Sequence, residues 1–594
     1  MLIRKILEVM AVLGDVARII EELVSAHPYI LLGVDYRGRV IYQSNEGGFN
    51  SIWVLDPSTG VRRRVSKEPI LWTTMVSDKR SRIVFTRDVS RGRELQVLGY
   101  IDFSRDEEFV YGSMKPLRIF GLADDGERIA FTGATETGVS IYLARGDEVS
   151  ELHRLDALAF VSDIRGGVVV GSGHLRRDPL STEIFIYNID SGDLRIYTPK
   201  EGSTNQYPII LGDGKILFTT NAFDGKNMLV LLDPETKEIT RLFFEKKDLE
   251  KYDPVEYIFY REYGKDLFVI GKREGRSRLF VNGELIDTPM GMVLSAYPYE
   301  NKIFFTYTSI MKPPRIMLRE DGVVREVIGS RFSRDIEERF GSIEFRYIES
   351  IDKLRIPIYV IRSNYYDKTR SAVVYIHGGP WSEVGDSWSI LIASLVASGF
   401  NVVAPNFRGS TGYGEEFRKL DIGDPGGGDL LDIEASAKFA LENGLGERLF
   451  VMGYSYGGFM TLWTMFNRPD LFECGVAGAS VADWEEMYEL SDAVFRSFID
   501  TLFAYKKDLL RDRSPIHKAE SLRKPLCIIH PQNDTRTPLK PVMRLINKLM
   551  ESGKVFEAHI VPDMGHVISS IDDAVKILLP ALLFLSRCVK ESKK

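Results

Sequence analysis

The stretch that decides the fold is VMGYSYGGFM, residues 451–460. In it Ser455 stands between Gly453 and Gly457, after the apolar run RLFVM and before the helix-like run GFMTLWTMFN. A serine in the pattern G-x-S-x-G, between a strand and a helix, is typical of the nucleophile elbow, a tight turn with no room for flanking side chains. The pattern therefore predicts that Ser455 presents its hydroxyl at the edge of a sheet.

The residues around this elbow alternate between strands and helices. The apolar runs SAVVYIHGG, FNVVAPN, KPLCIIHP and FEAHIVPD are separated by helical patterns such as DLLDIEASAKFALENG. Buried strands separated by helices predict a mostly parallel sheet that helices cover on both sides. We therefore expect an α/β-hydrolase domain over residues 330–594.

A serine hydroxyl is a weak nucleophile until a base takes its proton, and in this fold the partners follow in the order Ser, acid, His. Asp534 lies in HPQNDTRTP just after one predicted strand, and His566 lies in PDMGH just after the next. Both fall at the strand ends that carry the elbow, so the sequence predicts a triad of Ser455, Asp534 and His566. Asp563, on the same loop as His566, is the alternative acid.

The segment HGGPW, residues 377–381, follows the predicted strand SAVVYI. Glycines at this position supply one backbone N–H to an oxyanion hole, and the residue after the nucleophile supplies the other. We expect these donors to be Gly379 and Tyr456, with a plain turn as the alternative for HGGPW.

Residues 25–329 follow a different pattern, in which short apolar strands recur at intervals of 36 to 51 residues. Seven such strands share an aligned first position, at Ile41, Ile83, Ile129, Val168, Ile216, Leu267 and Ile303. A period in the forties with several strands per unit is typical of a β-propeller, here with seven blades, rather than of two generic β-sandwiches. Residues 1–24 predict an amphipathic helix that packs with the hydrolase domain.

Composition excludes several classes of function. The chain has 594 residues and a net charge of −7 without a long basic run, which argues against a nucleic-acid partner. Three widely spaced cysteines, no CxxC pair and no HExxH motif argue against a disulfide framework or a zinc site. We therefore expect no metal and no organic cofactor.

The N-terminal apolar run is interrupted by Glu8 and Asp15, so it predicts neither a signal peptide nor a membrane span. We expect a cytoplasmic protein without membrane contact that forms a homodimer or a higher homo-oligomer. The scarcity of glutamine points to a heat-adapted source.

The motifs HGGP, NFRGSTGYG, GYSYGG, HPQNDTRTP and PDMGH together resemble the prolyl oligopeptidase family of serine peptidases. The resemblance covers nearly the whole chain. Within the family, GASVADWEEMYELSD and the segment from HPQNDTRTPLKP to FEAHIVPDMGH are most similar to the archaeal acylaminoacyl-peptidases, which release an N-acylated amino acid from a blocked peptide. The resemblance implies short N-acylated peptides as partners, two-step acyl transfer and accompanying esterase activity.

The same resemblance implies a substrate pocket. Its lining would be Trp484, Phe495, Phe498, Ile499 and Leu502, of which the last four also fit one apolar helix face that points to the core. Such a pocket implies a large hydrophobic residue before the cut bond. Arg536 resembles a residue that anchors the substrate carbonyl, and a solvated arginine is the alternative.

Three other functions fit parts of the sequence. A carboxylesterase would use the same triad, and a propeller interaction module could carry a decayed hydrolase. A dipeptidyl or prolyl-type oligopeptidase is the alternative within the family. A dipeptidyl peptidase needs carboxylates that hold a free amino terminus, and Glu107 and Glu108 of the propeller segment are candidates.

Overall fold

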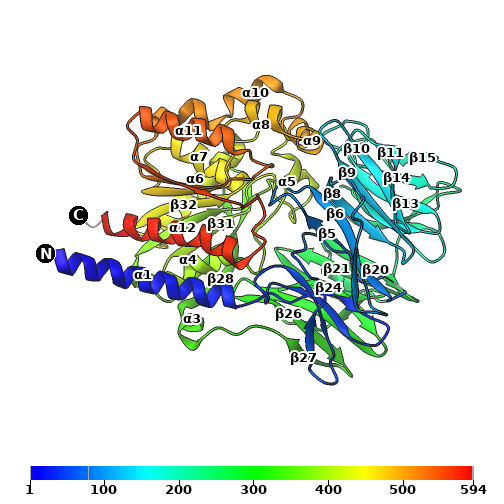
Figure 1. Cartoon of the computed structure of the whole chain (residues 1–594). Coiled ribbons are helices and arrows are strands. Elements are labelled where there is room, and N and C mark those ends of the chain that lie inside the picture. The colour runs from blue at the N-terminus through cyan, green and yellow to red at the C-terminus, as the bar shows by residue number, and fades with distance from the viewer. Residues whose placement is uncertain (1, 78, 592–594) are drawn as a thin grey trace.

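Figure 1 shows two parts of the chain side by side, a propeller of small β-sheets and a large sheet covered by helices. The computed structural model describes residues 2–77 and 79–591. The chain begins with α1 (Leu2–Ser25), passes through the propeller, and ends in the helix-covered sheet. The predicted combination of a seven-bladed propeller with an α/β-hydrolase domain is therefore confirmed.

Over the described residues, seven antiparallel sheets of consecutive strands form the propeller. The strands of the first three blades are β1 (Ile30–Val34), β2 (Val40–Ser44), β3 (Ser51–Leu55), β4 (Arg62–Arg64), β5 (Arg82–Asp88), β6 (Gln96–Asp102), β7 (Glu107–Val110), β8 (Arg118–Asp124), β9 (Arg128–Ala134), β10 (Val139–Arg145) and β11 (Glu148–Arg154). Those of the fourth and fifth are β12 (Ala159–Arg165), β13 (Val168–Gly173), β14 (Glu183–Asn188), β15 (Leu194–Tyr197), β16 (Asn205–Ile210), β17 (Ile216–Thr220), β18 (Met228–Leu232) and β19 (Ile239–Arg241). After α2 (Asp248–Tyr252), the last two blades contain β20 (Glu256–Tyr263), β21 (Asp266–Arg273), β22 (Arg276–Val281), β23 (Glu284–Ile286), β24 (Met292–Tyr299), β25 (Lys302–Ser309), β26 (Lys312–Glu320) and β27 (Val323–Ile328).

The seven aligned apolar positions lie on the second strand of each blade, or on β5 in the second blade. In that blade β5, β6 and β7 form the sheet, and residues 71–76 add backbone contacts to β5, such as the 3.0 Å bond from the Thr74 N–H to the Val84 carbonyl. Apolar clusters fill the spaces between successive sheets, because a blade buries both of its faces against its neighbours. This two-sided burial explains the recurring apolar strands of the sequence.

Each blade is built from its own stretch of chain, so the ring closes without exchange of strands between the first and last blades among the described residues. The closing contacts are hydrogen bonds between β1 and the seventh blade. The Leu31 N–H donates to Thr306 Oγ1 at 2.8 Å, and Ser295 Oγ donates to the Leu31 carbonyl at 3.0 Å. The ring is therefore held together here by a few polar contacts and by packing.

The hydrolase domain is built on one eight-stranded sheet with the order β28-β29-β31-β30-β32-β33-β34-β35. From β31 to β35 the neighbouring strands are parallel, and β28 and β29 are antiparallel additions at one edge. The strands are β28 (Phe340–Glu349), β29 (Arg355–Ser363), β30 (Ser371–Ile376), β31 (Asn401–Pro405), β32 (Arg448–Tyr454), β33 (Cys474–Gly478), β34 (Leu526–Pro531) and β35 (Phe556–Val561). The helices are α3 (Arg334–Arg339), α4 (Ile390–Ala397), α5 (Glu415–Lys419), α6 (Gly428–Glu442), α7 (Tyr456–Asn467), α8 (Trp484–Leu490), α9 (Ala493–Leu502), α10 (Lys507–Asp512), α11 (Leu539–Glu551) and α12 (Ile571–Glu591).

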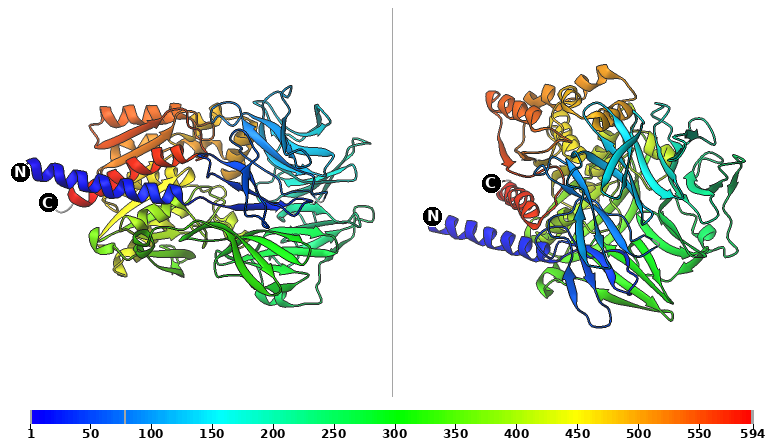
Figure 2. Two further views of the ribbon diagram at one scale, coloured as in Figure 1. Left: turned by 60° about the horizontal axis from the view of Figure 1, so that its bottom comes forward. Right: turned by 45° about the vertical axis from the view of Figure 1, so that its right-hand side comes forward.

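Two hydrophobic clusters cover the two faces of this sheet. One joins the strands to α6, α7 and α11, and the other joins them to α1, α4 and α12. Along β30, for example, Val374 faces the first cluster and Val373 the second, as the alternation of side chains in a strand requires. Both views of Figure 2 show α1 beside α12, so the first and last helices of the chain lie together on one face. None of the described helices is long and apolar enough to cross a membrane.

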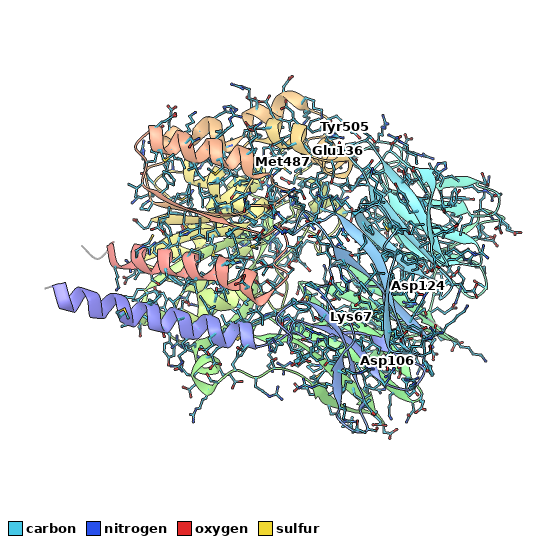
Figure 3. The ribbon with its side chains drawn as sticks, in the orientation of Figure 1. Lys67, Asp106, Asp124, Glu136, Met487 and Tyr505 are labelled. Carbon is cyan, nitrogen blue, oxygen red and sulfur yellow. The ribbon has the colours of Figure 1, made fainter. Side chains whose placement is uncertain are left out.

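The two domains touch along a seam that includes the hairpin loop between β5 and β6. The Arg496 guanidinium of α9 donates to the carbonyl of Glu136, a propeller residue that Figure 3 labels beside Met487 and Tyr505 of the hydrolase domain. Elsewhere on the seam Lys272 of β21 forms a buried ion pair with Glu383, which follows the HGGPW segment. The propeller therefore contacts the loops that surround the elbow.

Candidate active site

Ser455 sits on the tight turn between β32 and α7, with a backbone φ of 61° that few non-glycine residues adopt. A Cβ on Gly453 would lie 2.3 Å from the carbonyl oxygen of Gly457. A Cβ on Gly457 would lie 2.0 Å from the carbonyl oxygen of Ile376 on β30. Both distances are far shorter than a carbon–oxygen contact allows, so the turn can form only with glycine at these positions.

Hydrogen bonds connect the three residues that we predicted as a triad. Ser455 Oγ is 2.9 Å from His566 Nε2, and His566 Nδ1 is 2.7 Å from Asp534 Oδ2. Asp534 follows β34 and His566 follows β35, because the carboxyl ends of parallel strands meet at one edge of the sheet. The alternative acid, Asp563, is 73% exposed and lies 3.8 Å from Arg91 instead.

Asp534 is held as a carboxylate although it is buried. Its Oδ1 accepts the backbone N–H groups of Arg536 at 2.9 Å and Thr537 at 2.8 Å, and its Oδ2 accepts the Thr537 hydroxyl at 2.8 Å. Burial alone would raise the pKa of Asp534, but the charge and hydrogen bond of His566 together with these donors keep that pKa below its usual value. The ionised acid can therefore orient the imidazole and stabilise its protonated form.

The HGGPW loop lies directly against the serine. A Cβ on Gly378 would be 3.2 Å from Ser455 Cβ, and Gly379 has a φ of 133°, a value that only glycine adopts readily. Tyr456 is the first residue of α7, so its N–H has no acceptor within the helix. Gly379 and Tyr456 thus remain our predicted oxyanion donors, on two segments that meet at Ser455.

His377 fixes the start of that loop. Its ring stacks on Phe407 at a centroid distance of 4.4 Å, and its Nε2 is 2.9 Å from Ser410 Oγ. Burial lowers the pKa of His377 to about 4, so the imidazole is neutral near pH 7. His377 therefore supports the loop and does not compete with His566 as a base.

The side chain of Tyr456 points away from the serine, between two buried carboxyl groups. Its hydroxyl is 2.7 Å from Asp429 Oδ2 and 3.2 Å from Asp421 Oδ2. Burial and the charge of Asp429 raise the pKa of Asp421 well above its usual value. Burial and the charges of Asp432 and Asp424 raise the pKa of Asp429 to about 6. The residue that we predict to donate an oxyanion N–H is thus positioned by two carboxyl groups whose pKa values are raised.

Sequence reasoning missed Glu94, a propeller residue that reaches the catalytic loops. It lies in the loop between β5 and β6, is 4% exposed, and forms a two-bonded ion pair with Arg536 at 2.7 and 2.9 Å. Arg118 of β8 adds a third bond to the same carboxylate at 2.8 Å and also donates to Thr535 Oγ1 at 2.7 Å. Burial would raise the pKa of Glu94, but Arg536, Arg118 and the nearby His566 hold that pKa below its usual value.

No local signal could have identified Glu94, because it lies in the short hairpin sequence RGREL and meets Arg536 only after both domains have folded. For Arg536, which we predicted to anchor the substrate carbonyl, the structure shows that part of the guanidinium is already bonded. Two of its three guanidinium nitrogens, Nε and Nη2, are bonded to Glu94, so a substrate carbonyl would have to be met by the remaining N–H groups of Nη1 and Nη2 or by displacement of the pair.

The structure divides the five residues that we predicted to line the substrate pocket. Phe495 and Phe498 are partly buried at the seam, and Phe498 packs against Trp381 at a centroid distance of 5.4 Å. Trp484, Ile499 and Leu502 are 1%, 0% and 0% exposed and lie in the core of the hydrolase domain. The structure therefore places these three side chains in the core in this conformation. Phe495 and Phe498 remain our predicted pocket residues.

Glu107 and Glu108 lie on β7, the outermost strand of the second blade. Glu108 pairs with Arg87 at 2.9 Å and accepts the N–H of Lys67, which Figure 3 labels within the propeller. Glu108 is therefore engaged within the propeller, and the propeller carboxylate that meets the catalytic loops is Glu94.

Two family models match the chain. Residues 40–317 match the N-terminal domain of acylamino-acid-releasing enzyme-like proteins, and residues 387–592 match the prolyl oligopeptidase family. Among curated relatives, the dipeptidyl aminopeptidase BIII of Pseudoxanthomonas mexicana is 27% identical over 228 residues, 36% of this chain and 33% of that protein. The acylamino-acid-releasing enzyme of Sus scrofa is 28% identical over 239 residues, 38% of this chain and 32% of that protein. The curated matches thus span about a third of each relative's length.

The fold is similar to that of a solved acylaminoacyl peptidase of Pyrococcus horikoshii, with a TM-score of 0.70 and 19% identity over 96% of this chain and 97% of the other. At this identity the likeness establishes the shared architecture. Together with the elbow, the ordered triad and the two family models, it identifies the chain as a member of the prolyl oligopeptidase family, with an N-terminal domain like that of the acylamino-acid-releasing enzymes.

Proposed function

We propose that this protein is a serine peptidase that releases an N-acylated amino acid from short blocked peptides. One observation carries the proposal. The propeller carboxylate nearest the catalytic loops, Glu94, already has two arginine partners, Arg118 and Arg536. A free α-amino group that entered the site would therefore have to compete with two guanidinium groups for that carboxylate.

The proposed chemistry is acyl transfer through the serine. His566 takes the proton of Ser455 as the hydroxyl attacks the scissile carbonyl, and Asp534 stabilises the imidazolium that results. The N–H groups of Gly379 and Tyr456 stabilise the oxyanion. His566 then gives its proton to the leaving amine, and water reverses the steps to free the acylated product.

The charge of the substrate's amino end determines whether the site favours a blocked or a free substrate. An α-amino group has a pKa of about 7.7–8.0, so most of it is a cation at pH 7. A buried cation without an anionic partner costs several kcal/mol, which an acyl cap avoids because it removes the charge. The cap also offers a carbonyl oxygen that Arg536 could meet. Blocked substrates are thus favoured by a site whose carboxylate is already paired.

The second candidate is a dipeptidyl-type aminopeptidase, and Glu94 is also the observation that favours it. The relatives include a dipeptidyl aminopeptidase, and a substrate ammonium that displaced Arg536 would find a buried carboxylate beside His566. The two candidates differ in which cation occupies Glu94 during turnover.

The test compares acetyl-Phe-p-nitroanilide with Phe-p-nitroanilide between pH 6 and 9. The proposal expects the acetylated substrate to have the higher kcat/KM at pH 7, and the gap to narrow as the free amine loses its proton. Arg536→Ala should weaken the preference for the cap. Preference for the free amine at pH 7, lost in Glu94→Gln, would replace the proposal with the aminopeptidase.

We further propose that the propeller limits substrates to short peptides and that a large hydrophobic residue is preferred before the cut bond, through Phe495 and Phe498. A cleft of about 460 Å³ lies at the seam, lined by Val89, Ser90, Arg91, Arg93, Gln532, Asn533 and Asp563. Rates on intact casein and on its tryptic peptides test the size limit, and equal rates per susceptible bond would refute it.

Turnover of p-nitrophenyl esters without any turnover of peptides would instead indicate a carboxylesterase.

A further inference from the structure

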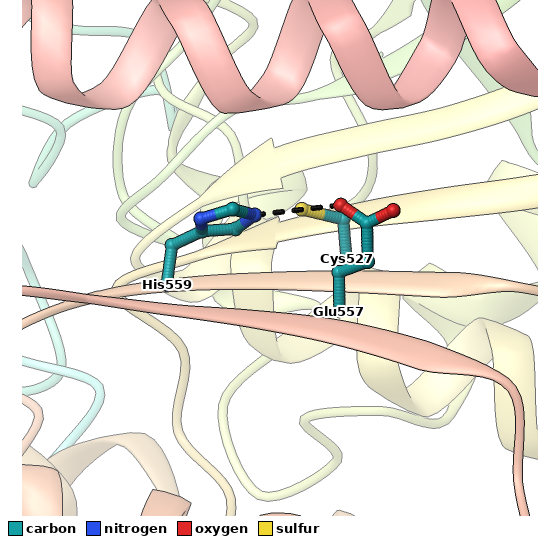
Figure 4. Close-up of side chains that lie close together, drawn as sticks. All are labelled: Cys527, Glu557 and His559. Atoms are coloured by element: carbon teal, nitrogen blue, oxygen red, sulfur yellow. Dashed lines mark ion pairs between the residues drawn. The ribbon is translucent and has the colours of Figure 1, made fainter.

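Three side chains with metal-binding atoms meet at the outer edge of the hydrolase sheet, apart from the triad. Figure 4 shows Cys527 on β34 with Glu557 and His559 on β35, on the face that α12 covers. Within the part of the chain that the structure describes, one thiol, one carboxylate oxygen and one ring nitrogen of these residues lie within 4.8 Å of one another. None of these three residues belongs to the triad, to the predicted oxyanion donors or to the predicted substrate pocket.

The strand register brings these residues together. Cys527 is directly opposite Glu557 on the neighbouring parallel strand, and His559 lies two residues beyond Glu557. Side chains two apart along a strand share a face, so all three project to the same side. The arrangement is therefore built into the sheet and does not depend on a loop conformation.

The chemistry of the three groups fits a thiophilic divalent cation. Zinc takes thiolate, imidazole and carboxylate ligands in tetrahedral geometry, at about 2.3 Å from sulfur and about 2.0–2.2 Å from nitrogen or oxygen. Two ligands at such distances from one tetrahedral ion are about 3.4 Å apart. His559 Nε2 and Glu557 Oε2 are 3.5 Å apart, so this pair already has the spacing that a shared ion requires.

A second observation concerns the ring nitrogen of His559. His559 Nε2 is buried and makes no hydrogen bond among the described residues, its ion-pair contact being Glu557 Oε2 at 3.5 Å, while 40% of the side chain is exposed. A buried polar atom without a partner is costly, and a metal ion would satisfy it. Cys527 is fully buried, and burial raises the pKa of its thiol, so the ion would have to displace the thiol proton.

One charge competes for the site. The Arg587 guanidinium of α12 contacts both oxygens of Glu557. A metal needs only one of these oxygens, and Arg587 can keep the other, as hydrogen bonds to ligating carboxylates commonly do. The thiolate and the carboxylate together balance the two charges of the ion.

We propose that Cys527, Glu557 and His559 bind one thiophilic divalent cation such as Zn²⁺, with water as the fourth ligand. The ion joins β35, the edge strand of the sheet, to β34. Because His566 follows β35 and Asp534 follows β34, bound metal would hold together the two strands that deliver the base and the acid.

The test uses the full chain, stripped of metal by a chelator, and Co²⁺ as the probe. We expect one Co²⁺ per chain and a near-ultraviolet thiolate-to-cobalt absorption that Zn²⁺ abolishes by displacement. Cys527→Ser should lose this absorption, and Cys474→Ser, which alters another buried cysteine of the same cluster, should keep it. His559→Gln changes a partly exposed side chain and should weaken Co²⁺ binding about tenfold or more.

Thermal unfolding gives an independent measurement, because a ligand that binds only the folded state raises its stability. Added Zn²⁺ should raise the Tm of the wild-type protein, and at the same Zn²⁺ concentration it should raise that of His559→Gln by less. Absence of stoichiometric Co²⁺ binding by the wild-type chain would overturn the proposal. Equal affinities of wild type and His559→Gln, or an undiminished charge-transfer band in Cys527→Ser, would do so as well.

Discussion

Glu94 of the propeller holds Arg536 of the hydrolase domain by two hydrogen bonds, of 2.7 and 2.9 Å. Arg536 stands two residues after Asp534, and its backbone N–H bonds the Asp534 carboxylate. The ion pair therefore connects the propeller to the loop of the catalytic acid. Because Glu94 is buried and the guanidinium is largely buried, loss of Glu94 would leave the Arg536 charge without its ion-pair partner.

Glu94→Gln should lower both stability and activity. Removal of one member of a buried ion pair typically costs about 3–5 kcal/mol. Here Arg536 loses its ion-pair partner, whereas Arg118 keeps its pair with Asp492. Denaturant unfolding should show the loss, and kcat/KM should fall because the loop of Asp534 is less well fixed. Glu107→Gln, on the exposed edge of β7, is the matched control. Identical unfolding curves for the two variants would contradict the structural role of Glu94.

Ser455→Ala should remove nearly all turnover, by on the order of 10⁶ in kcat, with a Tm close to that of the wild type. Asp534→Asn should cost less, since it mainly disturbs the orientation of the imidazole. Asp563→Asn should have little effect, because that side chain is exposed and pairs with Arg91. If Asp563→Asn were the more damaging of the two, Asp534 would not be the acid.

Phe498 and Ile499 are neighbours with opposite expected roles. Phe498→Ala should lower kcat/KM for a Phe substrate much more than for an Ala substrate. The variant would remove less apolar surface of the large Phe side chain from water on binding, whereas an Ala side chain has little such surface to lose. Ile499 is fully buried, so Ile499→Ala should lower the free energy of unfolding by about 2–5 kcal/mol and leave the substrate ratio unchanged. Steady-state kinetics and denaturant unfolding separate the two effects, and equal substrate ratios in wild type and Phe498→Ala would remove Phe498 from the pocket.

The carboxyl pair behind Tyr456 predicts a pH dependence of stability. A carboxyl whose pKa is raised by folding binds its proton more tightly in the folded protein than in the unfolded chain. The stabilising contribution of such a carboxyl to the folded state is therefore complete below about pH 4. It is lost as the pH rises through the folded-state pKa, which is about 6 for Asp429. Asp421→Asn keeps an acceptor for the Tyr456 hydroxyl and removes the repulsion between the carboxylates. It should flatten the fall in Tm between pH 5 and 8, and a slope equal to that of the wild type would refute the assignment.

The loop of His566 touches the propeller at a pair of glycines. A Cβ on Gly565 would lie 1.8 Å from the carbonyl oxygen of Gly92, so Gly565→Ala must displace one of the two loops. We expect kcat to fall at least tenfold, since misplacement of a reacting group by about 1 Å can cost about 100-fold. Gly112→Ala, where a Cβ would have open space, is the control. A Gly565→Ala enzyme with wild-type kcat would show that this contact does not position His566.

Local patterns were sufficient to predict most of the fold and the triad. The elbow depends on consecutive residues, and the acid and base follow a fixed order at strand ends, so Ser455, Asp534 and His566 could be placed from the sequence. The propeller was predictable because each blade must bury two apolar faces, which repeats the same strand pattern. The number of blades followed from the repeat alone.

Features that depend on contacts between distant segments could not be predicted. Glu94 meets Arg536 across the domain seam, and Cys527 meets His559 only through the register of two parallel strands. The apolar positions of α9 have the same helical pattern whether they face core or substrate, so periodicity could not separate Phe498 from Ile499. These distinctions arise when the domains pack together.

The bonds across the seam fix the loop of Asp534 to the propeller. Asn533 donates to the carbonyl of Arg91 and Thr535 to that of Arg93, so the loop of the acid is bonded to the same hairpin that carries Glu94. A separation of the domains wide enough to admit a peptide must break these bonds together with the Glu94–Arg536 pair. The enzyme would then be active only while the two domains are closed. If domain movement limits the turnover of a good substrate, higher solvent viscosity should slow that substrate more than a poor one, whose turnover is limited by the chemical step.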